Sequence, residues 1–323
     1  MCFEHPAPTR YIPCGHTVND PEQPSSVKPA DHPSAPGSPG PAVTTHDKPL
    51  DDPYDDFPYI GNGISGWVCD MGGGRAVKRP KLYQLWLYPD DKQLEYMNKE
   101  HQMMLAEEIK VFERLGRHEG IIECLKTSQH GIEMPLAEHG DLKSYMEAHP
   151  TQPAAITHAV KMNWTQSLLE ACTYIHSRMV LVGDIALRNV LVMGDLRLQL
   201  TDFGNALMFP LDEGLDINTI NDHGLTAQVE IFHVGWIIYS IATWHAHEYD
   251  DLDPEKPENR TNDEQYGPWW PDASRFPPLD GVFCGEIIAK CWAAGYKSME
   301  EVKGEVDRLF AAASSLEDTD SGL

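Results

Sequence analysis

Residues 61–68 read Gly-Asn-Gly-Ile-Ser-Gly-Trp-Val, and this spacing of three glycines suits a loop that binds phosphate groups. Glycine has no Cβ atom, so backbone N–H groups in such a loop can approach phosphate oxygens closely. Loops that bind dinucleotides share the spacing, but they open directly into a helix. Here strand-like residues follow, and a second strand-like run over residues 75–78 ends in Lys78. The pattern therefore favours a phosphate-binding loop between strands.

Two further motifs follow in the second half of the chain. Residues 184–189 read Asp-Ile-Ala-Leu-Arg-Asn, and residues 201–204 read Thr-Asp-Phe-Gly after an apolar run. Carboxylate and amide oxygens are the hard ligands that suit Mg²⁺. With the glycine loop and Lys78, these motifs occur in the order typical of one family. Over about residues 58–313 the chain resembles the eukaryotic protein kinase superfamily.

The resemblance implies a role for each motif residue. Lys78 would contact the α- and β-phosphates of ATP and pair with Glu108 on the following helix, with Glu107 as the alternative. Asp184 would orient the substrate hydroxyl and accept its proton. Asn189 and Asp202 would hold Mg²⁺. The other implied nucleotide-binding residues are Gly61, Asn62, Gly63, Ile64, Ser65, Gly66, Val68, Ala76, Met134 at the back of the pocket, Leu136 and Leu191.

Ala186 and Arg188 separate this chain from most serine/threonine kinases, which usually place a lysine where Ala186 stands. The Ala-Leu-Arg-Asn run is similar to that of tyrosine kinases and tyrosine-kinase-like kinases, as is the pair Cys291 and Trp292. We interpret this pattern as a sign of lineage and not of tyrosine specificity. It places Arg188 among the predicted catalytic residues.

The chain departs from the family at two places. The loop usually written His-Arg-Asp reads Val182, Gly183 and Asp184, and the missing arginine is the one that often pairs with a phosphate on the activation segment. Control by phosphorylation of that segment is therefore not expected. Glu230, in a run resembling a kinase helix that normally opens with aspartate, comes only 28 residues after Asp202, with no Ala-Pro-Glu motif before it. A reduced peptide-docking surface is expected.

The spacing of apolar and turn residues predicts the elements that hold these motifs. Leu105, Ile109, Phe112 and Leu115 recur at helical spacing, and Asp141 is a candidate cap of a second helix. Glycines 72–74 predict a tight turn before the Lys78 strand. The further predictions are a helix over residues 155–177, short strands over 190–192 and 198–201, an apolar helix from 229 and a closing helical region over 285–310.

The resemblance implies a two-lobed protein-kinase-like fold of the α+β class. Its small β-rich lobe would span residues 58–134, the hinge 135–140 and the larger, mainly helical lobe 141–313. Residues 1–57 contain about half of the 25 prolines and few large apolar residues, so we predict a disordered tail. Residues 314–323 are predicted to form a short acidic tail.

The formal net charge of −25 argues against a nucleic-acid partner, because phosphate backbones are bound by clustered Lys and Arg. The seven cysteines are scattered without paired metal spacing, which predicts reduced thiols in a cytoplasmic or nuclear protein. No apolar run is long enough to span a membrane, so no membrane partner is expected. The sequence specifies no oligomeric state.

The sequence thus predicts an ATP- and Mg²⁺-dependent enzyme that phosphorylates a Ser, Thr or Tyr hydroxyl of a protein substrate. Two alternatives stay open. A pseudokinase or nucleotide-binding scaffold is favoured by the altered Val182 and Gly183 and by the missing docking motif. A small-molecule phosphotransferase of the same superfamily is favoured by the step from Gly183 to Asp184, which such enzymes share.

Overall fold

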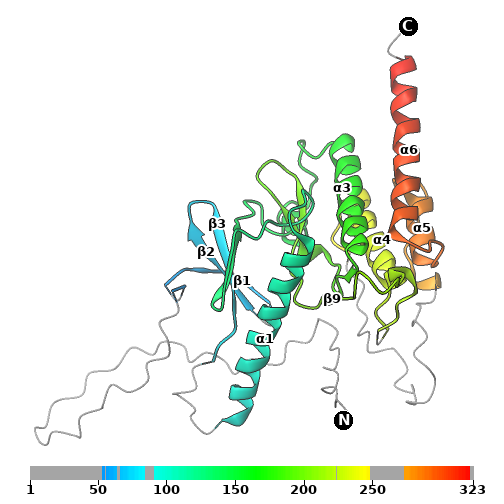
Figure 1. Cartoon of the computed structure of the whole chain (residues 1–323). Helices are drawn as coiled ribbons and strands as arrows, with labels where there is room; N and C mark the ends of the chain where they lie inside the picture. The colour runs from blue at the N-terminus through cyan, green and yellow to red at the C-terminus, as the bar shows by residue number, and fades with distance from the viewer. Residues whose placement is uncertain are drawn as a thin grey trace, which may run out of the picture.

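The computed structural model describes residues 53–54, 56–63, 66–83, 91–222, 224–247 and 273–320. Within these ranges a small lobe built on a sheet precedes a larger lobe built mainly of helices (Figure 1). The predicted two-lobed α+β fold is therefore confirmed. Most of the predicted tail over residues 1–57 lies outside the described residues, so its disorder stays a prediction.

The small lobe holds a five-stranded antiparallel sheet in the order β1-β2-β3-β5-β4. Its register pairs Val77 with Glu133 and Lys78 with Ile132. Because successive side chains of a strand point to opposite faces, Lys78 and Val77 lie on different sides of the sheet. The strands are β1 (Tyr59–Asn62), β2 (Gly66–Gly72), β3 (Arg75–Pro80), β4 (Lys126–Ser128) and β5 (Gly131–Pro135).

The long helix α1 (Lys92–Leu115) follows β3 and begins well before the predicted apolar stripe from Leu105. Asp91 caps its first turn by accepting hydrogen bonds from the backbone N–H groups of Gln93 and Leu94. Most residues of its first turns are exposed or half-buried, so no apolar periodicity marks them. Its last turns carry the buried side chains Leu105, Glu108, Val111, Phe112 and Leu115.

Within the described residues, the frame of the large lobe consists of the helices α2 (Leu142–Ala148), α3 (His158–Ser177), α4 (Ala227–Thr243), α5 (Gly285–Trp292) and α6 (Met299–Asp320). Asp141 caps α2 as predicted, and Thr157 and Thr226 cap α3 and α4. The fully buried Trp164, Leu169 and Ile175 of α3 lie in the central core with Ile238 of α4. The predicted closing helical region consists of α5 and α6, and α6 continues to Asp320, into the predicted acidic tail.

Short strands and turns between α3 and α4 carry the predicted catalytic motifs. The strands β7 (Val190–Val192) and β8 (Leu198–Leu200) pair as predicted, with Val190 opposite Leu200. Before and after them, β6 (Val180–Leu181) pairs with β9 (Leu207–Met208). Residues 187–189 form the 3-10 turn η2 (Leu187–Asn189), which leads into β7. This arrangement places residue 189 beside residue 201.

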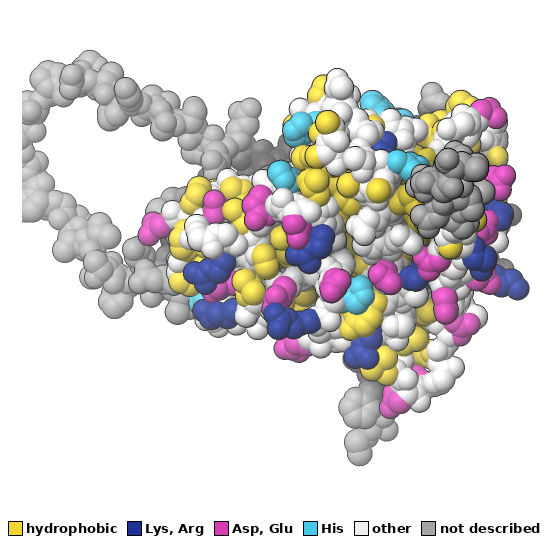
Figure 2. All heavy atoms as spheres, turned by 90° about the horizontal axis from the view of Figure 1, so that it is seen from above, with side chains coloured by type: hydrophobic (Ala, Val, Ile, Leu, Met, Phe, Trp, Pro, Cys, Tyr) yellow, Lys and Arg dark blue, Asp and Glu magenta, His cyan; other side chains and the backbone are white. Residues whose placement is uncertain are grey.

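Charges of both signs are interspersed on one face of the molecule. On the face shown in Figure 2, Lys and Arg side chains lie among Asp and Glu side chains and form no continuous basic stripe. None of the helices in the described ranges is long and apolar enough to cross a membrane.

Candidate active site

Lys78 and Glu108 form a buried ion pair between β3 and α1. The Lys78 Nζ lies 2.7 Å from Glu108 Oε2, and the two side chains are 8% and 1% exposed. Glu108 faces the sheet because it lies in the same helical stripe as Leu105 and Phe112, whereas the alternative Glu107 pairs with Lys110 on the surface. The structure thus selects Glu108 from the two predicted partners of Lys78.

Asp202 is the second carboxylate beside Lys78, with Oδ1 2.6 Å from Nζ. Burial alone would lower the pKa of Lys78, but the charges of Asp202 and Glu108 raise it above its ordinary value. Burial would raise the pKa of Asp202, yet Lys78 holds it below its ordinary value. The lysine is therefore a permanent cation and Asp202 is ionised at neutral pH.

Glu108 also reaches the segment that carries Asp202. Its Oε1 accepts a hydrogen bond of 3.1 Å from the backbone N–H of Phe203, and the Phe203 ring packs edge-on against Phe112 with centroids 5.3 Å apart. Asp202 itself has a φ of +61°, a left-handed conformation that is uncommon for a residue with a side chain. Two sets of contacts flank this residue. Its side chain pairs with Lys78, and the next residue, Phe203, contacts Glu108 and Phe112 of α1.

The loop between β6 and β7 holds Asp184 by two side chains that follow it. Asn189 Nδ2 donates to Asp184 Oδ2 at 3.0 Å and to the Asp184 carbonyl at 2.9 Å. Arg188 donates to Asp184 Oδ1 at 2.6 Å. The carboxylate is therefore fixed in orientation, yet Asp184 is half-buried and faces no competing acid in these contacts.

Glu230 of α4 also contacts this loop. The sequence motifs did not predict that contact. Its Oε1 accepts a bond of 2.8 Å from the Gly183 N–H, next to Asp184, and its Oε2 lies 2.6 Å from His176 Nε2 of α3. Glu230 is 2% exposed. A glutamate here reaches the loop through one more methylene than the aspartate that usually opens this helix.

Gly183 cannot be replaced by a larger residue without movement of its neighbours. Its φ is +78°, and a Cβ atom there would lie 2.4 Å from the Asn205 carbonyl oxygen. The segment after Asp202 thus packs directly on the position where the family usually has an arginine. An arginine at this position would collide with the Asn205 backbone as it lies here.

Hydrogen bonds also fasten the C-terminal end of α1 to the large lobe. The Arg114 guanidinium donates to the carbonyls of Phe209 at 2.9 Å and Arg178 at 3.2 Å. Arg178 donates in return to the Arg114 carbonyl at 3.1 and 3.2 Å. We call this reciprocal pair the arginine clasp. It joins the helix of Glu108 to both ends of the loop system that carries Asp184 and Asp202.

Two glycines of the predicted nucleotide-binding set lie close to Lys78 and Asp202. Gly66 approaches so closely that a Cβ would lie 2.7 Å from the Arg79 carbonyl and 3.4 Å from Lys78 Cε, and one on Gly63 would lie 3.9 Å from Asp202 Oδ2. Ile64 and Ser65 lie outside the described residues. Gly61 and Asn62 end β1, while the apolar residues of the set share one cluster: Val68, Ala76, Met134, Leu136 and Leu191.

The oxygen donors near Lys78 fit a hard divalent cation. Asp202 is ionised, and its side chain is 36% exposed. The Asn189 amide nitrogen donates to Asp184, which leaves the amide oxygen as the acceptor, and the Asn189 carbonyl accepts from Thr201 N at 3.0 Å, which keeps the two strands together. No cluster of three or more His, Cys, Asp or Glu ligands occurs in the described residues, so Mg²⁺ would need oxygen atoms from its nucleotide as well.

A family model described as protein tyrosine and serine/threonine kinase matches residues 92–214. The matched stretch contains Glu108, Asp184 and Asp202 and begins after the glycine loop and Lys78. The chain carries a eukaryotic protein-kinase-like domain. This agrees with the family resemblance of the sequence motifs.

Curated relatives that the chain matches include three kinases. The tyrosine-protein kinase SPK-1 of Girardia tigrina is 23% identical over 73% of this chain and 48% of its own length. The receptor tyrosine-protein kinase erbB-4 of Homo sapiens is 23% identical over 54% of this chain and 14% of its own length. Fibroblast growth factor receptor homolog 1 of Drosophila melanogaster is 31% identical over 32% of this chain and 17% of its own. The chain spans less than half the length of each.

Proposed function

We propose that this chain is an ATP- and Mg²⁺-dependent protein kinase that phosphorylates a Ser, Thr or Tyr hydroxyl. The observation that carries the proposal is the assembly of Lys78, Glu108 and Asp202 into one ion-paired cluster. Catalysis of phosphoryl transfer consists mainly of positioning and charge stabilisation. A lysine held by two carboxylates is already ordered before a nucleotide arrives.

Each residue has a separate task in this proposal. Lys78 binds phosphate oxygens of ATP, and Glu108 keeps its ammonium group in place. Asp184, oriented by Arg188 and Asn189, accepts the proton of the attacking hydroxyl. Asp202 and Asn189 would hold Mg²⁺, which supplies neutralisation of the phosphate charge when it is bound.

Tyrosine hydroxyls are the first acceptors to test. Two of the relatives named above are described as tyrosine-protein kinases, and the loop residues Ala186 and Arg188 resemble those of tyrosine kinases. Both observations concern ancestry, so serine and threonine peptides belong in the same assay.

A nucleotide-binding pseudokinase is the second candidate, and one contact favours it. The Asn205 carbonyl oxygen lies 2.4 Å from the place of a Cβ on Gly183, where the family usually has an arginine, and the chain has no Ala-Pro-Glu motif to form a peptide-docking platform. Such a protein would bind Mg-ATP through the Lys78 cluster without turnover.

The deciding experiment incubates the purified full chain with Mg²⁺ and ATP labelled on the γ-phosphate. Label is then measured on Tyr and Ser/Thr peptide libraries, on the chain itself and on small alcohols. We expect transfer to peptides that is abolished by Asp184→Asn, which keeps its fold, and strongly reduced by Lys78→Met. Asp184→Asn should still bind Mg-ATP, because Asp184 faces the hydroxyl acceptor.

Two surface substitutions serve as controls. Asp195→Asn removes an exposed carboxylate that pairs with Arg197, and Lys110→Met removes an exposed lysine paired with Glu107. Both should transfer label at the wild-type rate. Nucleotide binding without transfer by the wild type would favour the pseudokinase, and label on small alcohols alone would favour a small-molecule phosphotransferase.

A further inference from the structure

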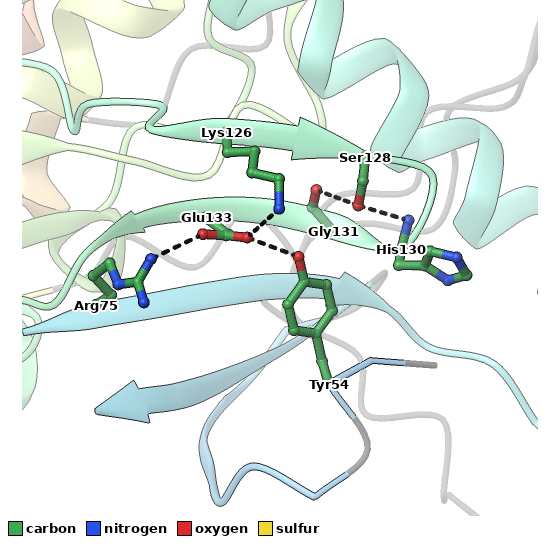
Figure 3. Close-up of polar contacts among 7 residues, drawn as sticks. All are labelled: Tyr54, Arg75, Lys126, Ser128, His130, Gly131 and Glu133. Atoms are coloured by element: carbon green, nitrogen blue, oxygen red, sulfur yellow. Dashed lines mark hydrogen bonds and ion pairs between the residues drawn. The ribbon is translucent and has the colours of Figure 1, made fainter. Parts of the chain in front are cut away.

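The segment just before β1 packs on the outer face of the small sheet. Tyr54 is 5% exposed and belongs to a small cluster with the buried Cys69 and Val77, against which Phe57 also packs. The Asp70 N–H donates to the Pro58 carbonyl at 2.9 Å and extends this contact toward β1. Figure 3 shows Tyr54 reaching from this segment to the sheet.

A carboxylate on β5 accepts a hydrogen bond from the Tyr54 phenol. Glu133 Oε1 accepts a hydrogen bond of 3.0 Å from Tyr54 Oη, and the cations of Lys126 and Arg75 lie 3.1 and 3.4 Å from the two carboxylate oxygens (Figure 3). Burial would raise the pKa of Glu133, but Lys126 and Tyr54 hold it below its ordinary value. Glu133 is thus ionised, and burial raises the pKa of Tyr54, which remains a neutral donor.

This contact lies directly behind the nucleotide-facing side of the sheet. Val77 and Glu133 are register partners on the outer face, while their chain neighbours Lys78 and Met134 face the opposite side. The segment therefore covers the outer face of β3 and β5. On their other face, β3 carries Lys78 and β5 carries Met134, which is predicted to lie at the back of the nucleotide pocket.

We propose that Tyr54 is a phosphorylation site and that its phosphorylation detaches this segment from the sheet. In the reaction the Tyr54 phenol oxygen attacks the γ-phosphorus of ATP, ADP leaves, and a base of the modifying tyrosine kinase takes the phenolic proton. A phosphotyrosine carries about −1.5 to −2 charges at neutral pH. That charge cannot occupy a buried position beside the ionised Glu133, because like charges repel and the desolvation cost is high.

The charge around Tyr54 favours detachment over rearrangement in place. Arg75 and Lys126, the two nearby cations, are already engaged by Glu133, and their side chains are 52% and 66% exposed. The neighbouring Asp56 is exposed and adds a further negative charge to the segment. A phosphate on Tyr54 would therefore join an acidic segment and compete with Glu133 for its cations.

Burial of Tyr54 makes its modification depend on prior opening of the contact. When the contact opens and closes faster than phosphate is transferred, the rate of Tyr54 modification follows the population of the open state. Glu133→Gln weakens the contact by replacing a charged acceptor with a neutral one, and it leaves only exposed cations without a partner. This variant should fold, and Tyr54 in it should be modified about tenfold faster.

The test uses the full chain carrying Asp184→Asn, so that only an added tyrosine kinase transfers phosphate. Rates at Tyr54 and at Tyr59, which is 55% exposed, are followed by peptide mass spectrometry in the presence and absence of Glu133→Gln. Hydrogen exchange of the Asp70 amide then reports whether the segment is docked. Tyr54→Phe is the matched control that keeps the ring and cannot be modified.

We expect Glu133→Gln to accelerate modification of Tyr54 and to leave Tyr59 unchanged. Phosphorylation should raise exchange at Asp70 at least tenfold, and Tyr54→Phe treated in the same way should show no such rise. The proposal is overturned if Tyr54 stays unmodified in both backgrounds, or if phosphorylated Tyr54 keeps the Asp70 amide protected. None of these outcomes depends on the chain's own catalytic activity.

Discussion

The Glu108 carboxylate joins three elements of the candidate site. It pairs with Lys78 on β3 and accepts a hydrogen bond from Phe203 N, so β3, α1 and the segment after Asp202 meet at this buried carboxylate. The burial that makes this contact specific also makes it costly. Burial raises the pKa of Glu108, and Lys78 opposes that effect.

Replacing Lys78 with Met should therefore destabilise the domain in a pH-dependent way. Removal of one partner of a buried pair costs about 3–5 kcal/mol. Without Lys78 the folded-state pKa of Glu108 rises further above its unfolded value of about 4.3, so the folded state binds more protons. Stability then falls as pH rises through that folded pKa. Urea unfolding should show a larger loss at pH 8 than at pH 5.5.

The double variant Lys78→Met with Glu108→Gln is the control for this assignment. The glutamine still accepts from Phe203 N but does not titrate. Its stability loss should depend less on pH than that of the single variant, because Asp202 is then the only one of the two carboxylates beside Lys78 that still titrates. An equal pH dependence in the single and double variants would mean that Glu108 is not the titrating group.

Gly183 offers a second test at the residue scale. Gly183→Ala places a Cβ 2.4 Å from the Asn205 carbonyl at a φ of +78°. We expect a loss of about 2–4 kcal/mol from strain and overpacking. Gly74→Ala is the matched control, since its φ is +73° and nothing lies within 4 Å of a Cβ there. It should lose only about 1 kcal/mol in urea unfolding.

At the scale of elements, helix α1 depends on the large lobe for its position. The arginine clasp and the bond from the Tyr174 hydroxyl to the Leu115 carbonyl hold its last turn, one to two turns after Glu108. In addition β9 pairs with β6 just before Phe209. Helix α1 therefore cannot move away from the large lobe without breaking its hydrogen bonds to Arg178, which precedes β6, and to Phe209, which follows β9.

Substitution of Arg114 should weaken nucleotide binding at a distance. Arg114→Met removes the bonds to Phe209 and Arg178, so α1 and Glu108 lose part of their support. We expect a lower thermal midpoint, by about 2–4 °C for each kcal/mol lost, and a smaller stabilisation by Mg-ATP. Arg197→Met, which removes an exposed pair with Asp195, should change neither quantity. An unchanged Mg-ATP effect in Arg114→Met would contradict a role for the clasp.

Short-range patterns predicted most of the helices and strands of the described residues. The β7–β8 hairpin and the Asp141 cap follow from residues close together in the chain. The contacts that support the motifs were not predictable in the same way. The bonds of Tyr54 to Glu133, Arg114 to Phe209 and Gly183 to Glu230 join residues 79, 95 and 47 positions apart, and only the folded chain brings them together.

At the scale of the whole molecule, the contact of Tyr54 adds packing on the N-terminal side of the predicted domain start at residue 58. The cluster of Tyr54, Cys69 and Val77 buries the outer face of the sheet. The segment before β1 is therefore part of the small lobe's packing, although the composition of residues 1–57 predicts little order.

Two truncations should separate these regions. Deletion of residues 1–50 should change the thermal midpoint by no more than about 1–2 °C, because this segment is poor in large apolar residues. Deletion of residues 1–57 should lower it by about 5 °C, because it removes a buried tyrosine and leaves Glu133 without its phenol donor. Differential scanning fluorimetry at equal protein concentration measures both. Identical midpoints for the two truncations would be inconsistent with a stabilising Tyr54 contact.

The contact between Gly183 and Asn205 also limits the mutational routes open to this protein. A single change from Gly183 to arginine would not restore a phosphate-responsive loop, because the new side chain would first collide with the backbone of the segment it should regulate. The segment around Asn205 would have to shift before that substitution became tolerable. The order of mutations is thus constrained: descendants that regain this type of regulation must remodel the segment first and acquire the arginine second.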